Sequence, residues 1–179
     1  MRQALTWITL GSIVPMLQST LVRFLPAPFC PDLSLLLAVA IGLCGRSVAG
    51  GLIFSAFLGC VADLLSGSLL GQHVLLRVLA FAAARSASVR VNLVGTGSRA
   101  LFVAVLTLLD GLAMGGLTAF FSPGARFVWI GFRTLVLMAG INALAALPTV
   151  RLVSWLLGRL RDEDGGRRLV RIEPRGWAA

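Results

Sequence analysis

Five ionisable side chains lie within the apolar segments of this sequence and could do chemistry: Asp63, His73, Arg77, Asp110 and Arg133. A charged group in such surroundings costs free energy, so it needs a partner or a function. Two neighbouring carboxylates could form an acid–base dyad, and a histidine could serve as a general base or as a metal ligand. The spacing of the residues decides which of these chemistries the chain can support.

Enzyme chemistry is disfavoured by this spacing. Asp63 and Asp110 are predicted at different depths in the membrane, so they do not form the dyad of an aspartyl peptidase. His73 is the only histidine, and it has neither companions at metal-ligand spacing nor a nucleophile to activate. We therefore expect no catalytic residues, no metal site and no cofactor.

Ion pairs are the other use for these charges. Asp63 ends one apolar segment and Arg77 lies one turn into the next, so their matching depths predict an Asp63–Arg77 pair. Asp110 and Arg133 form a second candidate pair, because a long arginine side chain can reach across a difference in depth. In one interpretation the Asp63–Arg77 bridge orders the outer turn of the protein. In the other, this corner binds a partner or a ligand.

The composition is typical of a membrane protein. Of 179 residues, 58% are hydrophobic and only 13% are charged, which leaves little for a water-soluble domain. The formal net charge is +9, and all 16 basic residues are arginine. Loops that face the cytoplasm and anionic lipid explain this charge better than nucleic acid, so we expect no nucleic-acid partner. Cys30, Cys44 and Cys60 have no metal-like or redox-like spacing.

Six apolar segments predict an all-α integral membrane protein, with a six-helix transmembrane bundle over residues 1–157. Asp32 directly follows Pro31 and is expected at the start of the second helix, where a carboxylate suits the helix dipole. The charged residues 158–179 predict a basic cytoplasmic tail that is flexible or lies on a surface. The predicted spans are approximately residues 5–21, 32–45, 48–65, 72–85, 101–121 and 128–147.

The arginines predict the orientation of these spans. With both termini inside, only Arg23 and Arg126 fall in outer loops, which is a strong positive-inside bias. A re-entrant fourth segment would move the arginine-rich tail outside, so we predict six spans even though the fourth is short. The inner arginines would be Arg2, Arg46, Arg85, Arg90, Arg99, Arg151, Arg159, Arg161, Arg167, Arg168, Arg171 and Arg175.

Small residues repeat every four positions along the third segment. Gly51, Ser55, Gly59 and Asp63 share one helix face, and such faces let helices approach closely in lipid. A similar face recurs in the fifth segment at Gly111, Gly115 and Ala119. Two interpretations remain open: the faces pack within one bundle, or one of them docks a helix of another protein.

A tight turn is predicted between the third and fourth segments. Ser66, Gly67 and Gly71 favour it, because glycine accepts positive φ and serine bonds to nearby backbone. His73 then caps the start of the fourth helix or bonds within the turn.

Two stretches carry a resemblance to a known family. They are PDLSLLLAVAIGL, from Pro31, and GGLIFSAFLGCVADLLSGSLLGQHVL, from Gly50. They resemble the rod shape-determining MreD proteins, in which Pro-Asp begins a span and a glycine-spaced helix ends in Asp. Ser-Gly, Leu-Gly and often His follow in that family. The match covers the central quarter of the chain.

This resemblance implies a function that the composition does not reveal. Proteins similar to MreD are non-enzymatic members of the rod complex in the bacterial inner membrane. They bind MreC, and through it act with a RodA-type glycosyltransferase, a class B penicillin-binding protein and MreB in lateral peptidoglycan synthesis. Their fold is similar to the six-helix substrate-binding subunit of energy-coupling-factor transporters. The alternative interpretation is such a subunit, which would need a polar pocket between helices.

Overall fold

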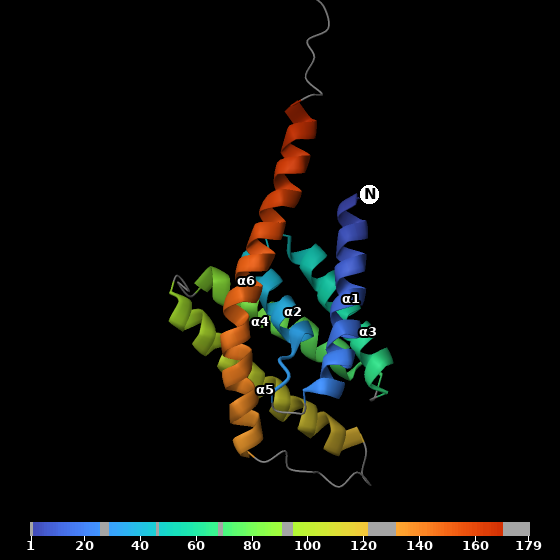
Figure 1. Ribbon diagram of the computed structural model, residues 1–179, viewed down its shortest axis with the longest axis vertical. Coiled ribbons are helices and arrows are strands. Elements are labelled where there is room, and N and C mark those ends of the chain that lie inside the picture. The colour runs from blue at the N-terminus through green and yellow to red at the C-terminus, as the bar shows by residue number, and fades with distance from the viewer. Residues whose placement is uncertain are drawn as a thin grey trace, which may run out of the picture.

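The computed structural model describes residues 2–25, 29–45, 47–67, 70–90, 95–121 and 132–169. Within these ranges every regular element is an α-helix, so the prediction of an all-α chain is confirmed (Figure 1). The predicted residues 128–131 of the sixth span and residues 170–179 of the tail lie outside the described ranges. The helices are α1 (Arg2–Phe24), α2 (Leu33–Cys44), α3 (Val48–Ser66), α4 (Gln72–Arg90), α5 (Thr96–Phe121) and α6 (Phe132–Leu169).

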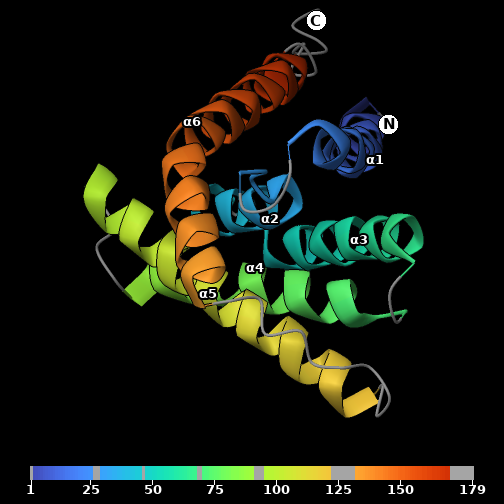
Figure 2. The same ribbon diagram turned by 60° about the horizontal axis from the view of Figure 1, so that its bottom comes forward.

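The short helix α2 forms the centre of the molecule. It contacts all five other helices, and every residue from Ser34 to Gly42 is buried. Around it, α1 contacts α3, α3 contacts α4, α4 contacts α5, and α5 contacts α6 (Figure 2). The sequence LSLLLAVAIGLC is apolar except for Ser34, and it suits this position because it offers no polar face to water.

The helices differ in their fitness to cross a membrane. In the described part of the chain, three are long and apolar enough: α3, α5 and the Arg133–Arg159 part of α6. Helix α2 has 12 residues, so it is about 18 Å long and shorter than the hydrocarbon core of a bilayer. The prediction of a membrane protein is therefore supported by three helices, whereas α2 is a buried central helix, too short to span alone.

Helix α6 extends beyond the predicted sixth span. That span was predicted to end near residue 147, with a tail from residue 158 that is flexible or lies on a surface, whereas α6 continues through Pro148 to Leu169. Val150 and Val153 explain much of this continuation, because both are buried in the core that contains α2. Figure 2 shows α6 bending along its course, as expected of a helix with an internal proline.

The two ends of the helix bundle differ in charge. At the end where α2 and α4 begin and α3 ends, Asp32 and Asp63 lie close to these helix termini. We call this the acidic end. The opposite end, where α2 and α4 end and α3 and α5 begin, contains Arg85, Arg90 and Arg99. We call it the arginine-rich end.

Candidate functional site

Asp32 lies at the centre of a buried polar network at the acidic end. As the N-cap of α2, its Oδ1 accepts hydrogen bonds from the backbone N–H of Leu35 at 3.0 Å and from the hydroxyl of Ser34 at 2.8 Å. Its Oδ2 accepts from Nη2 of Arg77 at 2.6 Å. These hydrogen bonds and the ion pair with Arg77 together hold the Asp32 carboxylate in place.

Arg77 connects three helices through its guanidinium group, although only 2% of the residue is exposed. Nε donates to the hydroxyl of Ser34 at 2.9 Å, and Nη1 donates to Oδ1 of Asp110 at 3.1 Å. With Asp32, these contacts join α2, α4 and α5. The predicted Asp63–Arg77 pair is thus wrong, because α2 begins deep in the bundle and brings Asp32 to Arg77 instead.

The predicted Asp110–Arg133 pair is also wrong. Asp110 pairs with Arg77, whereas Arg133 lies at the start of α6 with its side chain exposed. One arginine and two carboxylates make the buried cluster of Asp32, Arg77 and Asp110 formally negative. The hydrogen bonds within it reduce the cost of burying three charges.

Two amides that the sequence analysis did not single out extend the network. Gln18 of α1 donates to Asp32 at 3.3 Å and accepts from the Ser34 N–H at 3.1 Å. Asn142 of α6 accepts from the Asp32 N–H at 2.9 Å and donates to Thr107 at 3.3 Å. The only signal for either amide was an isolated polar residue in an apolar segment. Together they connect α1 and α6 to the cluster.

Asp63 has a different role, because it caps a neighbouring helix. One oxygen accepts from the Gly71 and Val74 N–H groups at 2.8 and 3.4 Å. The other accepts from the His73 N–H at 2.9 Å and contacts its ring Nδ1 at 2.8 Å. The first backbone N–H groups of a helix have no partner within the helix, so this carboxylate supplies one from α3. His73 lies in the first turn of α4 and bonds to the α3 carboxylate that caps this helix.

The turn that Asp63 closes contains two glycines with positive φ, Gly67 at 62° and Gly71 at 94°. Gly67 is the C-cap of α3 in the left-handed conformation. The Ser66 hydroxyl donates to the Asp63 carbonyl at 3.4 Å. Ser68 and Leu69, in the middle of the turn, lie outside the described residues. Gln72, which was not anticipated, fixes the turn to α5 by donating to the Met114 carbonyl and to Thr118, each at 2.9 Å.

The small-residue face of α3 packs inside the protein. A Cβ at Gly51 would lie 2.2 Å from the Phe81 ring, and one at Gly59 would lie 2.4 Å from the Val74 backbone. Ser55, between them, is fully buried. Helix α4 therefore covers the face from Gly51 to Asp63, and the interpretation that this face packs within one bundle is the one the structure supports. In α5, Gly111 packs on Leu135 of α6, but Ala119 is exposed.

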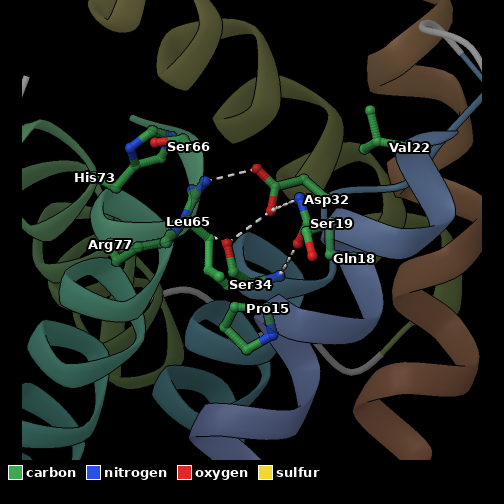
Figure 3. Close-up of a pocket in the computed structure, with 11 residues that line it drawn as sticks. Pro15, Gln18, Ser19, Val22, Asp32, Ser34, Leu65, Ser66, His73 and Arg77 are labelled. Carbon is green, nitrogen blue, oxygen red and sulfur yellow. Dashed lines mark hydrogen bonds and ion pairs between the residues drawn. The ribbon is translucent and has the colours of Figure 1, made fainter. Parts of the chain in front are cut away.

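A pocket of about 300 Å³ opens beside the polar network (Figure 3). Helix α1 forms one wall through Pro15 and Val22, and Leu65 of α3 forms another. The floor is polar and contains Asp32 and Arg77. Figure 3 shows that side chains from α1, α2, α3 and α4 converge on this pocket. The other lining residues are Gln18, Ser19, Ser34, Ala62, Ser66 and His73.

The site contains charges that bind one another and a pocket that could admit a ligand. Among the described residues, no group of three or more His, Cys, Asp or Glu side chains could hold a metal ion. The polar network can hold the helices together, and the pocket can bind and orient a ligand. The protein belongs to the class of all-helical proteins with helices able to cross a membrane. No protein-family model, curated protein or solved structure matches this chain.

Proposed function

We propose that this chain is a non-enzymatic scaffold in the bacterial inner membrane, with a role like that of MreD in the rod complex. One observation supports the proposal most. Asp32 from the first resembling stretch and His73 from the second line one pocket at the acidic end of the bundle, and Asp63, also of the second stretch, bonds to His73. In the proposed orientation the arginine-rich end and both termini are cytoplasmic. The acidic end then faces the periplasm.

The partner in this proposal is MreC, which would connect the scaffold to the RodA-type glycosyltransferase, the class B penicillin-binding protein and MreB. Its transmembrane helix needs a face other than that of α3, which α4 covers. The half of α5 nearest the acidic end offers one. Gly116 is exposed, and a Cβ there would have no neighbour within 4 Å. Leu112 and Phe120 beside it are 62% and 77% exposed. A small residue between large ones lets a second helix approach closely in lipid.

In this proposal the polar pocket also binds MreC. It would receive the segment of MreC that leaves the membrane on the periplasmic side. Asp32 and Arg77 on the pocket floor, with His73 beside them, would supply polar contacts to such a segment.

The test combines co-purification with site-directed crosslinking. Tagged protein is purified from gently solubilised membranes, and the proteins that accompany it are identified by mass spectrometry. In a background with Cys30, Cys44 and Cys60 replaced by alanine, Gly116→Cys is expected to crosslink to MreC. Val136→Cys on α6 is the control, because Val136 is also exposed. Absence of MreC from the purified material, or equal crosslinking at both positions, would contradict the proposal.

A second function is favoured by the pocket itself. The substrate-binding subunit of a vitamin transporter needs convergent polar groups between helices, and Gln18, Asp32, Ser34 and Arg77 provide them. Among the described residues, no Phe or Trp lines the pocket, which is unfavourable for stacking a vitamin ring. Native mass spectrometry of the purified protein separates the two functions. A bound vitamin and a co-purifying ATPase module would support the transporter subunit.

A further inference from the structure

A second cavity, of about 440 Å³, lies at the arginine-rich end and has an almost entirely apolar wall. It is formed by the first halves of α1 and α3 together with Leu157 of α6. Trp7 and Phe54 pack edge to face within the wall, with ring centroids 5.0 Å apart. Ile53, which also lines the cavity, is 72% exposed, so the cavity opens to the surroundings of the protein. Within a bilayer those surroundings are lipid.

The rim of this cavity includes one positively charged group. Gly45 lines the cavity, and its carbonyl accepts a hydrogen bond from Nη1 of Arg85 at 2.8 Å. This bond places the Arg85 guanidinium beside the cavity. The carboxylates of Asp32, Asp63 and Asp110 bond within the polar clusters of the opposite, acidic end.

An apolar cavity with a cationic rim matches the two parts of an anionic phospholipid. The acyl chain would replace lipid that otherwise contacts the exposed wall, and the phosphate would lie near the guanidinium group of Arg85. A zwitterionic phospholipid is a poorer match, because its cationic amine would also approach this arginine. We infer that this cavity is a binding site for one anionic phospholipid, with an acyl chain against Trp7 and the headgroup at Arg85.

Trp7 provides a direct measurement, since bromine atoms on an acyl chain quench tryptophan fluorescence on contact. Trp129, Trp155 and Trp177 are replaced by phenylalanine, so that Trp7 is the source of the signal. The full chain is reconstituted into phosphatidylcholine vesicles that contain increasing fractions of dibrominated phosphatidylglycerol or dibrominated phosphatidylcholine. We expect half-maximal quenching at a lower fraction of the anionic lipid. Equal quenching by both lipids would overturn the inference, because it would indicate only general contact with the bilayer.

Charge variants test the rim. Arg85→Gln is expected to reduce the preference for phosphatidylglycerol about fivefold. Arg85→Lys should retain the preference, because it keeps the charge. Arg90→Gln removes the same charge from an exposed position elsewhere and is the matched control. An equal loss of preference in the control would overturn the inference in favour of diffuse surface charge.

Steric variants test the apolar wall independently of charge. Gly50 lines the cavity and is exposed, so Gly50→Leu is expected to obstruct the acyl chain and weaken quenching by both brominated lipids. Gly140→Leu is the control, because Gly140 is an exposed helical glycine with no neighbour within 4 Å. Far-UV circular dichroism verifies that each variant is folded. Unchanged quenching in folded Gly50→Leu would show that the chain does not occupy this cavity.

Discussion

Nη2 of Arg77 donates to Oδ2 of Asp32 at 2.6 Å across 45 positions of sequence. This bond holds the start of the central helix α2 against α4. Water can solvate neither charge fully, because only 3% of the Arg77 side chain and 18% of the Asp32 side chain are exposed. Removal of one partner therefore leaves a buried charge without compensation.

We predict that Arg77→Met destabilises the protein by about 3–5 kcal/mol, because both Asp32 and Asp110 lose their cation. Asp110→Asn should cost much less, since it removes the excess negative charge and leaves the Asp32–Arg77 bond in place. Arg133→Met, at an exposed position, is the control. Thermal unfolding in detergent, followed by near-UV circular dichroism, measures the differences. Similar losses for Arg77→Met and Arg133→Met would contradict a structural role for the cluster.

We predict a larger effect at the cap of α4 than at the cap of α3. Asp63→Ala removes a buried carboxylate that accepts from three backbone N–H groups and contacts the His73 ring. Loss of at least about 2 kcal/mol is expected. Ser47→Ala removes one exposed cap, a bond of 3.1 Å to the Gly50 N–H, and should cost about 1 kcal/mol. Hydrogen exchange of the first turn of α4 provides a local measurement, and unchanged exchange in Asp63→Ala would refute the assignment.

Glycine variants should separate close packing from intrinsic helix propensity. Gly59→Ala is expected to cost about 1–3 kcal/mol, because its Cβ would meet the backbone of Val74, which cannot rotate away. Gly51→Ala should cost less, since the Phe81 ring can shift. Gly116→Ala has open space around it and should stabilise the helix by up to about 1 kcal/mol. A stabilising Gly59→Ala variant would mean that α3 and α4 are farther apart than described here.

Two buried serines give a matched pair for hydrogen bonding. The Ser34 hydroxyl donates to Asp32 and accepts from Arg77, so Ser34→Ala should cost about 1–3 kcal/mol. Among the described residues, the buried Ser55 hydroxyl has no hydrogen-bond partner. Ser55→Ala is therefore expected to be neutral or stabilising. Chemical denaturation of both variants in the same detergent is the measurement. The opposite order of stabilities would contradict the network.

Local features of the sequence were enough to predict the helices. Apolar runs between Pro-rich or Gly-rich turns predicted where α2, α3 and α5 lie, and Asp32 after Pro31 predicted an N-terminal helix position. Such features depend on residues a few positions apart, so they can be read without a fold. The extension of α6 to Leu169 was missed because Val150 and Val153 are buried only through contact with the central core.

The pairing of the charges was decided by the tertiary structure. The sequence suggested Asp63 and Asp110 as partners for Arg77 and Arg133, on the assumption that each helix begins at the membrane surface. Because α2 is short and central, its N-cap Asp32 lies deep inside the bundle and pairs with Arg77. Asp63 is therefore left to cap α4. The sequence by itself thus determined that Asp63, Arg77 and Asp110 enter the apolar interior, although it did not single out Gln18 and Asn142. Only the packing of α2 determined which of them meet, because burial forces each group to bond with its nearest partner.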